Sequence, residues 1–242
     1  MAPLPLEVAV FSAADALTAQ SLGAARIELN AAASYPCGGL TPSLSSLSQL
    51  SSLRVPVRVM IRPRGPPPTT TADFIYTAAE VAAMRAAIAA LKPALNPARG
   101  DGFVFGALTP TAAVDADTCR ELVACARPLL CVFHRAFDAL PDVEAGVDAL
   151  VRCGFAGVLT AGGPVGGGCA ANAERLAQVV ACCAAGRLEV VAGGGVRHHN
   201  VGALAARFAP GAGVWVHSAA LRADGTGLDE EELRKLLAAL AA

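Results

Sequence analysis

Residues 55–65 read Val-Pro-Val-Arg-Val-Met-Ile-Arg-Pro-Arg-Gly, and their alternation predicts a β-strand over residues 55–61. Side chains of a strand point alternately to its two faces. One face of this strand is purely aliphatic and consists of Val57, Val59 and Ile61. The other face consists of Arg58, Met60 and Arg62. Because the strands of a barrel present apolar side chains to the surrounding helices, the pattern predicts a barrel strand whose arginines point into the lumen.

The same alternation of a short strand, a loop and an Ala/Leu-rich helix recurs along the whole chain. Predicted strands occupy residues 6–10, 26–29, 55–61, 102–105, 130–133, 157–159, 188–191 and 213–216. Predicted helices occupy residues 13–22, 43–50, 77–91, 116–126, 142–153, 171–185, 199–208 and 229–241. Eight such units favour a (β/α)₈ barrel of the TIM type, an α/β fold. A doubly wound sheet usually has a glycine-rich first turn, whereas residues 11–14 here contain no glycine.

We expect one domain over residues 1–242. The Pro/Thr-rich residues 66–71 are expected to extend a loop at the barrel mouth rather than to separate domains.

Composition excludes several classes of protein. Of the 242 residues, 54% are hydrophobic and 16% charged, which excludes a disordered, charge-rich chain. A net charge of −1 predicts no nucleic-acid partner and no binding to anionic membranes. The long uncharged stretches 29–53 and 154–173 are interrupted by prolines or glycines, so we expect no membrane span. The eight cysteines form no C-x-x-C pair or zinc-like spacing, and the first residues lack signal-peptide features, so a cytoplasmic location is expected.

Strand parity predicts that several ionisable side chains face the lumen. These are Glu7, Glu28, Arg58, Arg62, His134, Glu189 and His217. Arg26, Arg58 and Glu189 lie early in their strands, where a buried layer of ion pairs is expected. Glu28, Arg62, His134 and His217 lie at the carboxyl ends, where barrels of this type bind ligands. The alternative for this upper group is a second packing layer of ion pairs.

The upper group suggests particular chemistry. Arg62, stiffened by Pro63, can present its guanidinium to a carboxylate or phosphate, or pair with Glu28 on the neighbouring strand. Glu28, His134 and His217 are candidates for acid–base catalysis, and a histidine at a strand end is also a potential metal ligand. Both imidazoles are expected to donate hydrogen bonds to a bound anion when protonated.

Further candidates follow other strands. Asp138 either caps the next helix or orients an arginine. The turn at residues 193–195 either binds phosphate through its backbone N–H groups or is a tight turn without a ligand. The full set of predicted ligand-binding residues is Glu28, Arg62, Arg64, His134, Arg135, Asp138, Thr160, Gly193, Gly194, Gly195 and His217.

Motifs along most of the chain resemble one family. They are RIEL (26–29), GGLTPS (38–43), VMIRPRG (59–65), FVFGAL (103–108), FHRAFD (133–138), VLTAG (158–162) and AGGG (192–195). Together they are similar to the motifs of the CutC family, the copper homeostasis proteins. The resemblance implies a TIM-type barrel, a cytosolic protein with a role in copper tolerance or copper binding, and homodimers.

Copper is the cofactor or cargo that this resemblance implies. Where the family usually reads R-I-E-L-C, this chain has Asn30 in place of the cysteine. Since Cu(I) prefers thiolate ligands, we expect weak Cu(I) binding, carried by a cysteine such as Cys37. The alternative function is that of a barrel enzyme acting on a small anionic metabolite at the mouth. The residues alone leave open whether the protein is an enzyme.

Overall fold

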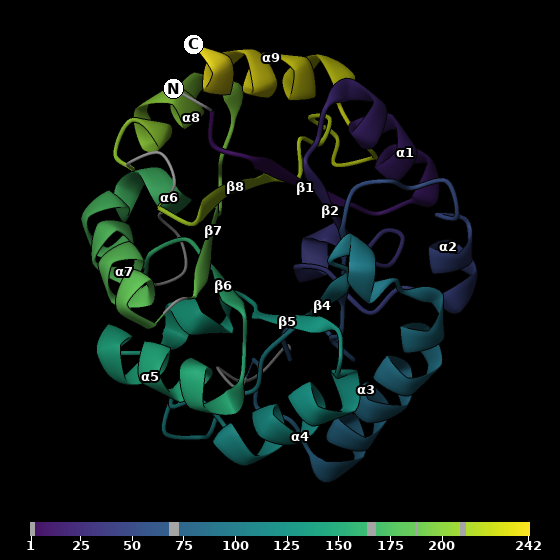
Figure 1. Ribbon diagram of the computed structural model, residues 1–242, viewed down its shortest axis with the longest axis vertical. Coiled ribbons are helices and arrows are strands. Elements are labelled where there is room, and N and C mark those ends of the chain that lie inside the picture. Colours follow the sequence, from purple (N-terminus) through teal and green to yellow (C-terminus); the bar gives the residue numbers. More distant parts are fainter. Residues whose placement is uncertain (1–2, 68–72, 164–167, 187, 209–211) are drawn as a thin grey trace.

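The fold is a closed barrel of eight parallel strands. The computed structural model describes residues 3–67, 73–163, 168–186, 188–208 and 212–242. Each strand pairs in parallel with the next along the chain, and β8 pairs with β1, while helices surround the ring (Figure 1). The strands are β1 Leu6–Val10, β2 Arg26–Leu29, β3 Val57–Met60, β4 Gly102–Phe105, β5 Leu130–Phe133, β6 Gly157–Thr160, β7 Glu189–Gly193 and β8 Val214–Ser218. The predicted TIM-type barrel is confirmed.

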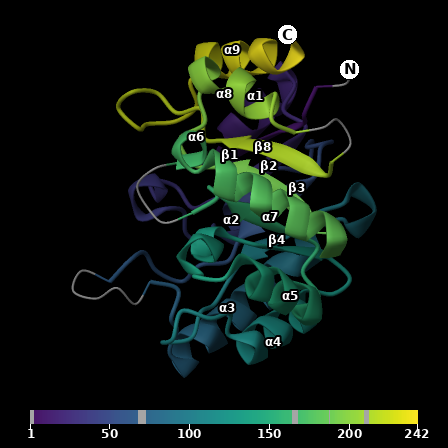
Figure 2. The same ribbon diagram turned by 90° about the vertical axis from the view of Figure 1, so that its left-hand side faces the viewer.

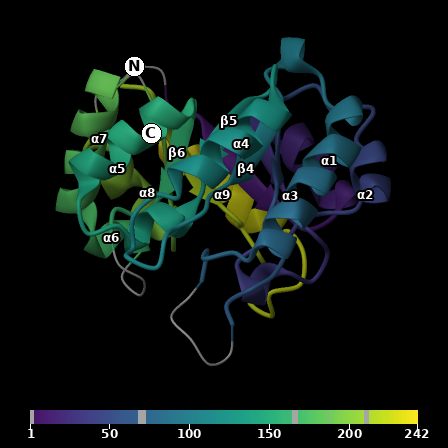
Figure 3. The ribbon, with the colours of Figure 1, turned by 90° about the horizontal axis from the view of Figure 1, so that it is seen from below.

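The helices cover the outside of this barrel. They are α1 Ala13–Leu22, α2 Leu44–Ser48, α3 Ala78–Leu91, α4 Ala116–Ala126, α5 Val143–Cys153, α6 Gly168–Ala171, α7 Ala173–Gly186, α8 His198–Ala205 and α9 Glu230–Ala241. Four short 3₁₀ helices also occur: η1 Tyr35–Cys37, η2 Lys92–Ala94, η3 Pro97–Arg99 and η4 Arg135–Ala139. Figure 2 faces the side covered by α5 and α7, and Figure 3 faces the side covered by α3, α4 and α5.

Local sequence signals explain where these elements begin. Ser12 caps α1 by accepting a hydrogen bond from the backbone N–H of Asp15, and Thr77 forms a capping box with Glu80 at the start of α3. β3 is shorter than its prediction and begins after Pro56, which has no N–H to donate to a neighbouring strand. The helix predicted over 171–185 is α7, and the short helix α6 before it was not predicted.

The parity of β3 is confirmed by the separate apolar clusters that its two faces join. Val57, Val59 and Ile61 are completely buried in the apolar layer between barrel and helices. A second, smaller apolar cluster fills the middle of the lumen. It consists of Met60, Val104, Val132, Leu159 and Val191, with Trp215 packed against them.

The lower lumen holds the expected layer of ion pairs. Arg26 pairs with Glu7, and one of its terminal nitrogens lies 2.8 Å from Oε1 of Glu189. Its guanidinium also lies 3.8 Å from the centre of the Trp215 ring, which places the charge layer directly against the apolar cluster. Arg58 donates to the carbonyl of Gly100.

All eight cysteines are free thiols. No helix in the described ranges is long and apolar enough to cross a membrane.

Gly102 tests how tightly the barrel wall is built. A Cβ atom at this position would lie 2.2 Å from the carbonyl oxygen of Leu130, on the adjacent strand. Gly102→Ala is therefore expected to lower the free energy of unfolding by about 3 kcal/mol, the upper end for overpacking, as measured by urea denaturation.

Gly202→Ala in α8 is the matched control. Its Cβ would meet no atom closer than 3.9 Å, so the substitution should raise the free energy of unfolding by about 0.5–1 kcal/mol. Equal stability of the two variants would contradict the packing described for β4 and β5.

Candidate functional site

A cavity of about 440 Å³ opens at the carboxyl ends of the strands. That volume lies in the range of small-molecule sites, about 300–1,000 Å³. The four side chains predicted for the upper lumen, Glu28, Arg62, His134 and His217, all line it. Further lining residues include Asn30, Cys37, Asp73, Phe74, Arg135, Gly193, Gly194, Gly195 and Arg197. Pro66 also lines the cavity, whereas residues 68–71 of the Pro/Thr-rich segment lie outside the described ranges.

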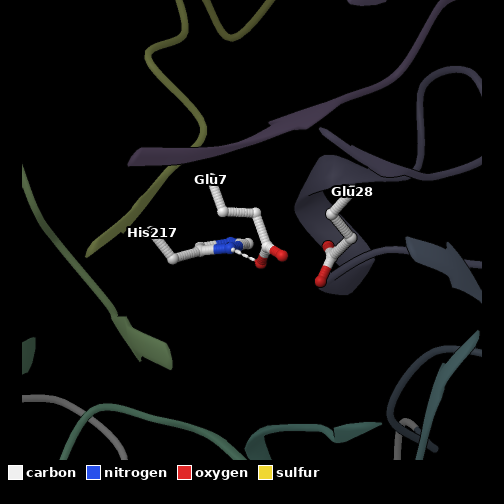
Figure 4. A group of neighbouring side chains, drawn as sticks. All are labelled: Glu7, Glu28 and His217. Carbon is white, nitrogen blue, oxygen red and sulfur yellow. Dashed lines mark hydrogen bonds and ion pairs between the residues drawn. The ribbon is translucent and has the colours of Figure 1, made fainter. Parts of the chain in front are cut away.

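Three side chains form an acid–base cluster at this end of the lumen: Glu7, Glu28 and His217 (Figure 4). One polar atom from each lies within 4.8 Å of the others, and Nδ1 of His217 lies 2.7 Å from Oε1 of Glu7. The register of β1 against β8 pairs Glu7 with His217, which brings Glu7 to the level of the upper group. Strand parity predicted that Glu7 faces inward but did not place it in the site.

Glu7 is the anionic member of the cluster. Burial alone would raise the pKa of this carboxyl group, but the charge of Arg26 and the hydrogen bond with His217 lower it to about 2. Because the carboxylate is ionised and accepts from Nδ1, it fixes the orientation of the imidazole.

Glu28 and His217 share the remaining protons of the cluster. Burial raises the pKa of Glu28, despite the opposing charge of His217. Burial tends to lower the pKa of His217, but the negative charges of Glu28 and Glu7 outweigh it and raise that pKa above 6.5. Two ionisable groups whose pKa values are both raised therefore lie side by side, which suits them to exchange a proton with a ligand.

His134 has a different protonation state. Burial, together with the charge of Arg62, lowers its pKa to about 3, so the ring is neutral at physiological pH. Its Nδ1 accepts a hydrogen bond of 3.3 Å from the backbone N–H of Ala136, which leaves the proton on Nε2. The expectation that a protonated His134 binds an anion is therefore wrong, although the neutral ring still offers one donor.

Arg62 does not pair with Glu28, as one prediction had it, but with Asp73. One terminal nitrogen donates to both carboxylate oxygens of Asp73, at 3.1 and 2.9 Å. The other donates to the backbone carbonyls of Cys37 and Gly39, and the guanidinium lies 4.9 Å from the ring centre of Phe74. Arg62 thus joins two loops of the mouth, and its charge is already balanced within the protein.

Arg64 lies outside the cavity lining. It forms an ion pair of 2.5 Å with Glu80 and donates to the carbonyl of Ile75. The prediction that it binds a ligand is not supported, because its guanidinium is engaged by Glu80 and Ile75 outside the cavity.

Asp138 and Thr160 also lie behind the cavity lining rather than in it. Asp138 accepts from the Thr160 hydroxyl at 2.6 Å and from Nε of Arg135 at 2.8 Å. The N-cap of α5 is Asp142 instead. Of the two roles considered for Asp138, the structure shows the second: Asp138 orients Arg135, which lines the cavity.

The glycines after β7 allow close packing at the mouth. A Cβ on Gly193 would lie 2.9 Å from Cδ2 of His217, so a side chain there would displace the imidazole. Gly194 and Gly195 have φ angles of +136° and +67°, which few other residues adopt. Arg197 follows this turn and also lines the cavity.

Residues 4–221 match the CutC family. The chain belongs to the CutC family.

Its relatives include mouse and human proteins, each named a copper homeostasis protein cutC homolog. Each is 40% identical to this chain, over 200 and 204 residues respectively, and each match covers 81% of this chain and 67% of the relative. The crystal structure of a copper homeostasis protein CutC from Streptococcus agalactiae superimposes with a TM-score of 0.77 at 26% identity, covering 89% of this chain and 98% of that one. Phosphoribosyl anthranilate isomerase from Thermotoga maritima shares the fold alone, with a TM-score of 0.58, 11% identity and 98% coverage of both chains.

The two cavity histidines should titrate differently. In a pH series followed by ¹⁵N-detected NMR of the imidazoles, His217 should show a midpoint above 6.5. His134 should remain neutral, with its proton on Nε2, between about pH 5 and pH 8. A His134 midpoint near 6.5 would contradict the burial and tautomer described here.

His217 also links stability to pH. Because its pKa is higher in the folded protein than in the unfolded chain, its contribution to stability is fully present below 6.5 and is lost as pH rises through the folded-state pKa.

Proposed function

We propose that the protein acts in copper homeostasis, as its mouse and human relatives are named, and that it works in the cytoplasm as a homodimer of single-domain barrels. The observation that carries this proposal is family membership over residues 4–221, a span that includes every lining residue of the cavity. Eight free thiols are compatible with a reducing compartment.

Copper would be the cargo of this protein, and the donor atoms at the mouth limit how it can be held. Cu(I) prefers thiolates, and Cys37 is the single cysteine among the described lining residues. Cys37 is exposed, whereas Asn30 is buried beside Glu28 and donates its amide N–H to that carboxyl group at 2.9 Å. A single thiol, with the Met60 thioether as the one other sulfur donor among the described lining residues, supports weak binding of Cu(I).

Cys37→Ser should therefore abolish Cu(I) binding at the mouth. The measurement is a titration of the reduced protein against a Cu(I)-specific chromophoric chelator, with Cys182→Ser in α7 as a control that leaves this binding in place. Tight one-to-one binding that survives Cys37→Ser would sink the assignment of copper to Cys37.

A second candidate function is favoured by the acid–base cluster. We propose an enzyme that moves a proton on a small anionic metabolite, with Glu28 and His217 as the exchanging groups and Glu7 as a positioning residue. A carboxylate that orients an imidazole beside a second carboxyl group with a raised pKa is an arrangement suited to general acid–base catalysis. Carrying a soft metal ion requires no such arrangement.

Glu28→Gln should lower the pKa of His217, because the negative charge of Glu28 is the largest influence that raises it. Glutamine keeps an oxygen to accept from Asn30. NMR titration of His217 measures the shift, and Glu231→Gln on the exposed face of α9 should leave it unchanged. An unaltered His217 midpoint in Glu28→Gln would contradict the electrostatic coupling between Glu28 and His217.

The proposed activity can be detected without knowing the product. Small phosphorylated or carboxylated hydroxy-carbonyl compounds are incubated with the protein in D₂O, and ¹H NMR follows exchange of the C–H proton beside the carbonyl group. Catalysed exchange that is lost in Glu28→Gln supports the enzyme. Exchange at the uncatalysed rate for every compound in the set would contradict it.

A further inference from the structure

Four buried polar atoms of cavity-lining residues lack partners within the described residues: Nε2 of His134, Oε2 of Glu28, Oδ1 of Asn30 and Nε of Arg62. The first two belong to residues that are 3% and 4% exposed. An unpaired polar group in a protein interior destabilises the folded state unless a ligand or water bonds to it. Both residues line the cavity, so a ligand hydroxyl group could satisfy both atoms by accepting from Nε2 of His134 and donating to Oε2 of Glu28.

The positive charge in the cavity lies with other residues than Arg62. Arg62 donates to both oxygens of Asp73 and is neutralised by it. Arg197 also lines the cavity, and no carboxylate of the described residues lies within ion-pair distance of it. Its hydrogen bond of 3.0 Å to the Leu221 carbonyl holds the side chain in place without cancelling the charge.

A second arginine meets the same turn. Arg135 forms an ion pair with Asp138 through Nε, so its charge is partly balanced, but its terminal nitrogens make no hydrogen bond within the described residues and can donate to an anion. Its guanidinium carbon lies 3.5 Å from the point where a Cβ of Gly194 would be. Nothing lies within 4 Å of a Cβ built on Gly195. An anion can therefore approach the backbone of this turn with a guanidinium beside it.

We propose that Arg197, Arg135 and the Gly194–Gly195 turn form an oxyanion subsite for a small organic anion, a phosphate monoester or a carboxylate. The ligand's hydroxyl or carbonyl oxygen accepts a hydrogen bond from Nε2 of His134 and lies beside Glu28. This inference rests on the proposed enzyme and specifies its substrate class. Met60 and Leu159 line the cavity as well and supply an apolar surface for the carbon atoms between the two polar ends.

Calorimetry with defined probes tests both ends of the ligand. The probes are glycerol 3-phosphate, glycerate, inorganic phosphate and glycerol, at low ionic strength. Glycerol 3-phosphate or glycerate should bind more tightly than inorganic phosphate, and glycerol should not bind. Whichever of these two organic anions binds with the higher affinity shows whether the subsite prefers phosphate or carboxylate.

Arg197→Gln should lower the affinity for the organic anion by about tenfold or more, which is the scale of one charge-assisted hydrogen bond. Arg234→Gln on exposed α9 is the control and should bind as the unmodified protein does. Circular dichroism verifies that each variant is folded. If Arg197→Gln proves unfolded, Arg135→Gln provides the same test, because the subsite predicts a similar loss.

His134→Asn tests the other end of the ligand. Asparagine can still accept from the Ala136 N–H but has no Nε2 donor. The variant should bind glycerol 3-phosphate or glycerate more weakly than the unmodified protein does, and its affinity for inorganic phosphate should be unchanged.

The outcomes separate the subsite from the enzyme. If the unmodified protein binds none of the anions, or if the Arg197 and Arg135 variants bind them as well as it does, the subsite is overturned, whether or not deuterium exchange is catalysed. If the anions bind through Arg197 and no compound exchanges deuterium, the subsite stands and the proposed enzyme is contradicted.

Discussion

The buried carboxylate of Glu7 connects the two polar layers of the lumen. It accepts from Arg26 on β2 and bonds to His217 on β8, and it lies on β1, where the barrel closes. Removing one partner of a buried ion pair leaves an uncompensated charge, which costs several kcal/mol, roughly 3–5. The same carboxylate therefore helps to hold the lower ion-pair layer and fixes the imidazole that faces the ligand cavity.

A second buried pair shapes the entrance. Arg62 joins the loop before α2 to the segment at Asp73 and Phe74 that precedes α3. Phe74 in turn packs edge-on against His134, with ring centres 4.7 Å apart. Burial of the ring, to which Phe74 contributes, and the charge of Arg62 together lower the pKa of His134 and keep it neutral. The cavity thus has a neutral donor on one side and an acid–base cluster on the other, each set by buried charge.

Sequence periodicity predicted much of this arrangement because barrel strands obey strict parity. The alternation in residues 55–65 placed Arg58 and Arg62 inward, and the same rule placed Glu28, His134 and His217 at the mouth. Parity does not determine the stagger between strands, so it could not show that Glu7 reaches the level of His217. Nor could it show the Arg62–Asp73 pair or the depth of His134, because both depend on how long loops fold back over the mouth.

Glu7→Gln tests the interaction of the Glu7 carboxylate with His217 and Arg26. The substitution removes the negative charge and keeps the shape of the side chain, and Glu7→Asp retains the charge as a matched variant. Measured by NMR titration of His217, the midpoint should fall in Glu7→Gln and remain above 6.5 in Glu7→Asp, with the urea midpoint of unfolding also lower in Glu7→Gln. A His217 midpoint unchanged in Glu7→Gln, in a protein as stable as the unmodified one, would contradict the central role of this carboxylate.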